Sequence, residues 1–117
     1  MVYNSTVLYP NDEGATFDLK YYVDIHMPIV MKYWSKHGLL GYQLIHYDTS
    51  FDGTKPYNLG AILTWDSKEC IKTAVASEES KAVFQDVPNF TNRRAHFLVG
   101  EFVGSQGSEH GYDGRTD

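Results

Sequence analysis

The stretch FDLKYYVDIHMPIV, residues 17–30, decides the fold of the first half of the chain. Asp18 suits the N-cap of a helix, and Phe17 before it can pack against the first turns as a hydrophobic staple. Apolar and aromatic residues then recur at helical spacing from Leu19 to Lys36, which predicts one long helix. Gly38 is placed to end that helix, because glycine adopts the left-handed conformation of a C-cap at little cost.

The interior of this helix is unusual because it contains a proline. Tyr22, Ile25 and Ile29 are predicted to lie near one another on one face, with His26 one turn beyond Tyr22. Pro28 lacks a backbone donor, so it should kink or restart the helix near His26. A helix break frees backbone groups, and we therefore expect a pocket beside this histidine.

The remaining patterns predict four strands and a second helix. The strands are expected at Val2–Tyr9, Gly41–Tyr47, Tyr57–Trp65 and Ala95–Val103, and the helix runs from a cap at Asp66 or Ser67 to about Phe84. The order βαββαβ predicts an α+β, ferredoxin-like fold, with a four-stranded antiparallel sheet and two helices on one face. Its other face would be bare and apolar, which favours a homodimer.

Composition narrows the class of protein. The chain has 117 residues, a net charge of −5 and no basic stripe, so nucleic acid is an unfavoured partner. The single cysteine, Cys70, excludes a disulfide within the chain. Neither a signal-peptide pattern nor a membrane-length apolar run is visible, and we expect a cytoplasmic protein without membrane contact. Residues 1–103 form the predicted domain, and the Gly-, Ser- and Asp-rich residues 104–117 a flexible tail.

Residues 17–30 resemble the signature of the EthD family, in which a Phe-Asp start and a Tyr-Tyr pair precede His-x-Pro and aliphatic residues. Residues 8–10 (LYP), 86–91 (DVPNFT) and 100–102 (GEF) are similar to further parts of that family, in the expected order. Two stretches depart from it. Residues 92–96 (NRRAH), which include His96, stand where members often carry a proline followed by aliphatics, and the tail after Val103 has no clear family counterpart.

The resemblance implies a dimeric α/β barrel in which two four-stranded sheets face each other, with a pocket between each sheet and its helices. The family is named for its association with ether degradation and has few established activities. Related barrels include polyketide cyclases, decarboxylases and monooxygenases, mostly without a metal or organic cofactor. The resemblance therefore predicts the fold more narrowly than the reaction.

Three residues are candidate catalytic groups. His26 can exchange a proton near neutral pH, and Tyr22 one turn earlier could orient it through its hydroxyl. The alternative is that His26 bonds to backbone and fixes the kink. His96 shares a strand face with Gly100, which leaves space for a ligand; the alternative, which we favour, is an exposed histidine at a strand start.

A second group of residues is predicted to bind substrate. His46 shares a strand face with Tyr42 and could join His26 if that face meets the helices. An apolar, aromatic lining would suit a planar phenolic ligand, and the candidate lining residues are His46, Tyr42, Trp65, Phe84 and Phe90. No tight metal-ligand spacing or nucleotide-binding glycine loop occurs, so neither metal nor cofactor is predicted.

These features lead to three hypotheses. The first is a cofactor-free enzyme of the lyase or cyclase type, which acts on a small aromatic or polyketide-like metabolite of secondary metabolism by cyclisation, dehydration or decarboxylation. The second is a cofactor-free oxygenase of an anthrone-like phenol, which needs the same deprotonation. The third is a non-enzymatic protein that binds a hydrophobic metabolite.

Overall fold

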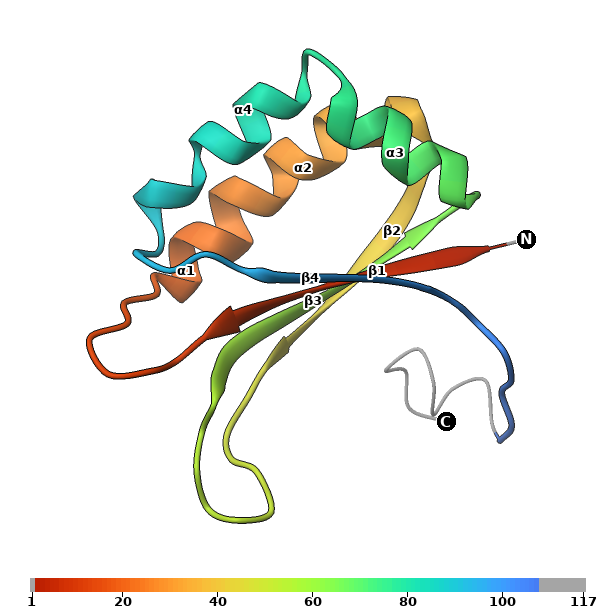
Figure 1. Cartoon of the computed structure of the whole chain (residues 1–117). Helices are drawn as coiled ribbons and strands as arrows, with labels where there is room; N and C mark the ends of the chain where they lie inside the picture. Colours follow the sequence, from red (N-terminus) through yellow and green to blue (C-terminus); the bar gives the residue numbers. More distant parts are fainter. Residues whose placement is uncertain (1, 108–117) are drawn as a thin grey trace.

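The computed structural model describes residues 2–107, which form two layers (Figure 1). One layer is a four-stranded antiparallel sheet of order β2-β3-β1-β4. Its strands are β1 (Tyr3–Pro10), β2 (Leu39–His46), β3 (Tyr57–Trp65) and β4 (His96–Glu101). All helices lie on one side of the sheet, as Figure 1 shows. The predicted ferredoxin-like fold is confirmed.

The predicted bounds of β3 are confirmed at both ends, and those of the other three strands differ by one or two residues at each end. The predicted tail at 104–117 lies mostly outside the described residues, and 102–107 carry no regular secondary structure. Within residues 2–107, no helix has the length and apolar character needed to cross a membrane.

The first helical segment is continuous, but its geometry changes along its length. It consists of α1 (Leu19–Tyr21), the π-helix η1 (Tyr22–His26), α2 (Met27–Trp34) and the 3₁₀ turn η2 (Ser35–His37). Both predicted caps are confirmed. The Asp18 carboxylate accepts a hydrogen bond from the Tyr21 N–H at 3.0 Å, and Gly38 ends the helix at φ 99°. Phe17 packs on Tyr22 with a ring separation of 5.2 Å, which is the predicted staple.

The π-helix η1 explains why one side chain of this helix does not lie on the face predicted from the sequence. The Met27 N–H donates to the Tyr22 carbonyl, five residues back, just before Pro28, which has no N–H to donate. This wider turn changes which side chains face the sheet, and Tyr22, His26, Val30 and Trp34 are buried. Ile25 is 46% exposed whereas Tyr22 is buried, so the prediction that these two side chains share one face was wrong.

The second predicted helix is broken in two. Helix α3 (Lys68–Ala76) begins at Ser67, whose hydroxyl accepts from the Cys70 N–H at 3.3 Å. It ends at Ser77, which is extended and whose hydroxyl donates to the Ala74 carbonyl at 2.6 Å. That local bond competes with helix propagation. The chain restarts as α4 (Ser80–Gln85) and the 3₁₀ turn η3 (Val87–Asn89), which carry it back over α2 (Figure 1).

The core lies between the helices and the sheet. Alternate residues of β3 (Leu59, Ala61, Leu63 and Trp65) are buried against the helices, as the period of two predicts. Trp65 is fully buried, and its indole N–H donates to the Ser5 hydroxyl at 2.9 Å. Because Trp65 is enclosed in this way, it supports the sheet.

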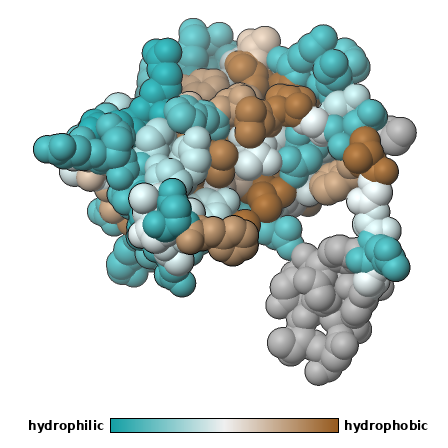
Figure 2. Space-filling view, turned by 60° about the horizontal axis from the view of Figure 1, so that its bottom comes forward, coloured by the Kyte–Doolittle hydropathy of each residue, from teal (hydrophilic) through white to brown (hydrophobic). Residues whose placement is uncertain are grey.

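The opposite face of the sheet has no helix over it. Strand pairing places Leu8, Ile45, Ile62 and Leu98 on this open face, and Leu98 is 58% exposed. Figure 2 turns the underside of the molecule forward and shows hydrophobic side chains gathered among hydrophilic ones. The predicted bare and partly apolar face is therefore present.

Candidate functional site

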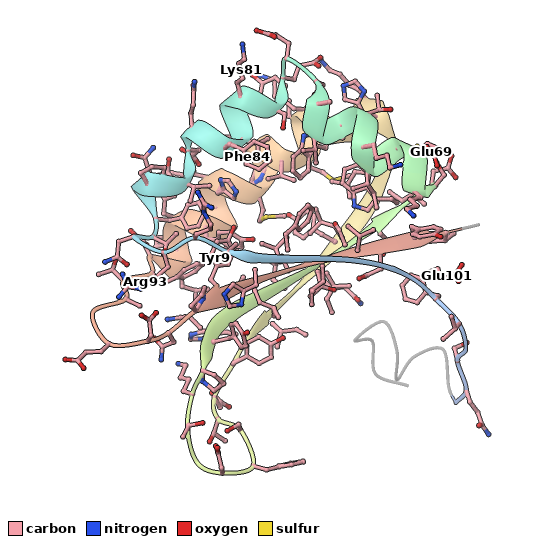
Figure 3. The ribbon with its side chains drawn as sticks, in the orientation of Figure 1. Tyr9, Glu69, Lys81, Phe84, Arg93 and Glu101 are labelled. Carbon is pink, nitrogen blue, oxygen red and sulfur yellow. The ribbon has the colours of Figure 1, made fainter. Side chains whose placement is uncertain are left out.

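A cavity of about 460 Å³ opens between the helical layer and the β1–β4 side of the sheet. This volume lies within the range of small-molecule pockets, roughly 300–1,000 Å³. Its walls are mostly apolar. The lining residues are Val7, Tyr9, Tyr22, His26, Met27, Val30, Trp34, Leu63, Val83, Phe84, Val87, Arg94, Ala95 and Phe97. Figure 3 shows Tyr9 at the sheet and Phe84 on α4, on opposite sides of the space between the layers.

His26 is the buried imidazole of this cavity. Only 3% of the residue is exposed, and its Nδ1 lies 2.9 Å from Oδ2 of Asp86. Asp86 is the one hydrogen-bond partner of the His26 ring among residues 2–107. The ring's Nε2 is thus the nitrogen available to a ligand. The alternative in which His26 bonds to backbone does not describe this structure.

Asp86 is itself held from the other side. Its Oδ1 accepts hydrogen bonds from the Tyr21 hydroxyl at 2.5 Å and from the Asn89 side-chain amide at 2.9 Å. Tyr21 comes from α1 and Asn89 from η3, so two separate segments fix the carboxylate. A carboxylate fixed in this way fixes the orientation of the imidazole in turn.

The charges of the His26–Asp86 pair follow from burial and hydrogen bonding. Burial lowers the pKa of His26, and the neighbouring Asp86 only partly offsets this effect. Burial alone would raise the pKa of Asp86, but hydrogen bonds from Tyr21, Asn89 and His26 outweigh it and the pKa is lowered. At neutral pH the pair is therefore a neutral imidazole whose Nδ1–H donates to a carboxylate, with a basic Nε2.

Two tyrosines line the cavity beside His26. Burial raises the pKa of Tyr9 to about 12, and burial together with the nearby Tyr9 raises the pKa of Tyr22 further. Both hydroxyls thus remain protonated at any physiological pH. The Tyr22 hydroxyl donates to that of Tyr9, which leaves the Tyr9 hydroxyl as the donor available to a ligand. Such a donor suits an oxygen atom that gains negative charge.

The predicted role of Tyr22 in orienting His26 through its hydroxyl is not what the structure shows. The two rings stack at a centroid distance of 5.2 Å and an interplanar angle of 26°, and Asp86 supplies the hydrogen bond instead. Phe90 packs on the imidazole at 4.5 Å. Tyr22 and Phe90 therefore shape the site by packing.

The other predicted site residues divide into two groups. Phe84 lines the cavity, whereas Phe90 and Trp65 are buried beside it or deeper in the core. Tyr42 faces the helical layer and is partly buried, but it does not line the cavity. His46 shares the face of Tyr42, as predicted, yet it is exposed near the end of β2 and does not join His26.

His96 lies on the other side of the sheet. It pairs with Leu8 on the open face, and its Nδ1 is 3.0 Å from the hydroxyl of Tyr57. A β-bulge between Tyr9 and Pro10 places Tyr57 on this face as well. The structure thus separates His96 from the cavity, and a Cβ added at Gly100 would meet open space on that same open face.

Sequence reasoning did not select Asp86, Tyr9 or Arg94. Asp86 and Tyr9 both lie inside the motifs quoted for the family resemblance, at 86–91 and 8–10, and this was the available signal. Arg94 lies in none of the motifs quoted for the resemblance. Among residues 2–107, no three histidine, cysteine or acidic side chains converge to hold a metal ion.

The lowered pKa of His26 gives a pH prediction. Its free imidazole would titrate near 6.5, so between the folded pKa and 6.5 the unfolded chain binds more protons and stability falls on acidification. We expect the His26 ring resonance in NMR to titrate with a midpoint below 6.5, assigned by its loss in His26→Gln. A midpoint above 6.5 would contradict this and show that the Asp86 carboxylate outweighs burial.

No known family profile matches the sequence, and no curated protein matches it either. Among solved structures, an EthD-like protein from Ralstonia eutropha JMP134 superposes with a TM-score of 0.79 and 26% identity, over 90% of this chain and 95% of that one. The resemblance to the EthD family is confirmed.

Other solved structures also superpose on this chain. An EthD family protein from Bacillus halodurans C-125 has a TM-score of 0.70 and 22% identity, over 88% of this chain and all of that one. SnoaB from Streptomyces nogalater, described as a cofactor-independent oxygenase, has a TM-score of 0.59 and 10% identity, over 92% of this chain and 96% of that one. At these identities the two likenesses support the EthD-like fold alone.

Proposed function

We propose that this EthD-like protein is a cofactor-independent enzyme that moves a proton on a small aromatic or polyketide-like metabolite. The observation that carries the proposal is the His26–Asp86 pair at the wall of an apolar cavity. The proposed outcome of the proton transfer is a cyclisation, dehydration or decarboxylation of the lyase or cyclase type.

The base is Nε2 of His26. It takes a proton from an acidic C–H or O–H of the substrate, and the resulting imidazolium is stabilised by the Asp86 carboxylate at Nδ1. A neutral resting imidazole is the competent form of a base, which agrees with the lowered pKa. The same ring then returns the proton to another atom of the substrate.

When the proton leaves, the electron pair of the broken bond is delocalised onto an oxygen of the substrate. The protonated hydroxyl of Tyr9 is the candidate donor to this enolate or phenolate oxygen, and the Tyr22 hydroxyl donates in turn to Tyr9. In an apolar enclosure each such hydrogen bond is stronger than in water, since fewer water molecules compete for the oxygen. The proton transfer therefore needs no group beyond the side chains of the cavity.

A cofactor-independent oxygenase is the second candidate. SnoaB carries that description on the same fold, and oxidation of an anthrone-like phenol would begin with the same deprotonation. Molecular oxygen would then be the oxidant and would be consumed in step with the substrate. Binding without turnover, unaffected by His26 substitution, would instead favour a metabolite-binding protein.

The test is turnover of a panel of phenolic and polyketide-like compounds, with products identified by mass spectrometry in air and under argon. A cyclase, dehydratase or decarboxylase gives the same products in both atmospheres. An oxygenase gives product only in air, with a matching signal at an oxygen electrode. Retention of every compound unchanged, with measurable binding, would contradict both enzymatic proposals.

We also propose that the open face of the sheet is the homodimer interface. Its apolar side chains, including Leu98 at 58% and Ile45 at 38% exposure, have no covering element among the described residues. Two copies pressed face to face would bury both sets. Figure 2 shows hydrophobic patches on this side of the molecule, interspersed with hydrophilic ones.

Leu98→Glu is the variant that tests this interface. A carboxylate buried in an apolar interface is costly, so we expect the dimer dissociation constant to rise by about 100-fold or more. Native mass spectrometry and light scattering measure the change. Val75→Glu, on the outer side of α3, is the matched control and should leave the mass unchanged. A wild-type monomer, or an unaffected Leu98→Glu dimer, would refute the interface.

A further inference from the structure

Arg93 and Arg94 are adjacent in sequence but differ in their surroundings. The Arg93 guanidinium donates to the Asp12 carboxylate at 2.8 Å and to the Glu13 carbonyl at 2.6 Å, and it lowers the pKa of Asp12. Arg93 thus secures the loop after β1. Arg94 has no carboxylate partner among residues 2–107, and it lines the cavity. Its charge is accordingly available to a ligand.

The position of Arg94 makes the electrostatic potential of the cavity more positive at its mouth than at its inner wall. Arg94 is exposed, as are Phe84 and Phe97 at 49% and 44%, so these three lining residues mark the mouth. At the inner wall stands neutral His26, with the Asp86 carboxylate behind it. Of the described residues that line the cavity, Arg94 is the one with a charged side chain at neutral pH. A ligand with a negative end would be drawn toward the mouth by Arg94 and away from the inner wall by Asp86.

We propose that Arg94 is a specificity-determining residue, and that the substrate is an aromatic or polyketide-like anion. Its carboxylate or comparable group pairs with Arg94 at the mouth, and its uncharged ring system fills the apolar interior against His26. Guanidinium groups suit this role because their planar fork of donors matches a carboxylate. The net charge of −5 makes a local cation more important still, since the rest of the surface repels anions.

Binding of the anionic group at Arg94 determines which part of the substrate meets the base. It presents the uncharged, proton-losing part of the substrate to Nε2 of His26 rather than its charged group. The inference rests on the proposed function for the identity of this inner end. The choice of an anionic ligand does not depend on catalysis, because it follows from the cavity and Arg94 alone.

The test uses two fluorescent probes that share their rings and differ in charge. 8-Anilinonaphthalene-1-sulfonate carries an anionic group, and N-phenyl-1-naphthylamine does not. Dissociation constants are measured for both with wild type, Arg94→Gln, Arg94→Lys and Arg93→Gln. Arg93→Gln removes the same charge one residue away and is the matched control. NMR shift changes at the Val87 and Ala95 amides locate both probes.

We expect Arg94→Gln to weaken binding of the sulfonate probe about two- to fivefold, in the range of an exposed charge pair, and to leave binding of the uncharged probe unchanged. Arg94→Lys should restore part of the loss, and added salt should reduce the wild-type preference. Equal effects on both probes, no effect on either, or an equal loss in Arg93→Gln would overturn the proposal. Shifts confined to the open face around Leu98 would overturn it too.

His26→Gln separates this inference from the proposed function. If Arg94 selects anions, the probe preference persists in His26→Gln, whatever that substitution does to turnover. Loss of turnover without loss of preference supports both proposals. Preference without any turnover in the wild-type protein retains the anion site and rejects the catalytic role.

Discussion

His26→Gln is expected to lower the rate of substrate turnover by about 10²–10⁴, the range for losing a general acid–base group. Glutamine can occupy the buried site and hydrogen-bond to Asp86, but it has no nitrogen that takes up a proton near neutral pH. The loss should therefore appear mainly in kcat, with KM little changed. Steady-state kinetics on any compound that the substrate panel identifies measures both constants.

The control for this variant is its stability and its ligand binding. Thermal unfolding should show a folded protein, and N-phenyl-1-naphthylamine should still bind in its cavity, as judged by the NMR shift changes at the Val87 and Ala95 amides. A folded His26→Gln protein with full activity would remove His26 from the mechanism. The buried histidine would then have a packing role against Tyr22 and Phe90.

Asp86→Asn is expected to lower kcat by a comparable factor, about 10²–10⁴, for a different reason. An asparagine that presents its NH₂ to His26 Nδ1 forces the proton onto Nε2, which removes the base. An asparagine that presents its oxygen to Nδ1 of His26 turns its own NH₂ toward the NH₂ of Asn89. Two hydrogen-bond donors then face each other with no acceptor between them. Either arrangement also costs stability, by about 1–3 kcal/mol for a disrupted buried hydrogen bond.

Tyr21→Phe is the matched control for Asp86→Asn. It removes one donor to the same carboxylate and keeps the negative charge, so turnover should fall by less than about tenfold. The pH profile is the second readout. A carboxylate that merely holds the fold would leave the acid limb of kcat/KM where it is in wild type, and that result would deny Asp86 a positioning role.

Much of the fold could be predicted because local signals agree with the tertiary structure. The Asp18 cap, the Phe17 staple and the Gly38 C-cap each depend on neighbours within a few residues, and the structure confirms all three. Pro28 correctly predicted an irregular helix beside His26. The wider π turn was not predictable from spacing, and so Ile25 was assigned to the wrong face.

The candidate site was only partly predictable because its partners come from distant parts of the chain. His26 and Asp86 are 60 residues apart, and the break between α3 and α4 that precedes Asp86 was expected to be helical. His96 had the right residue type and an open neighbour in Gly100, but strand alternation does not say which face meets the helices. Register with β1 settles that His96 lies on the open face.

The most direct test of the central claim is deuterium exchange into anthrone in D₂O under argon, where no oxidation can compete. Wild-type protein should accelerate exchange at the acidic C–H above the rate in buffer, and His26→Gln should return it to that rate. Equal acceleration of the exchange by wild type and His26→Gln would contradict proton transfer by His26. No acceleration by wild type, although anthrone is bound at His26, would contradict it as well.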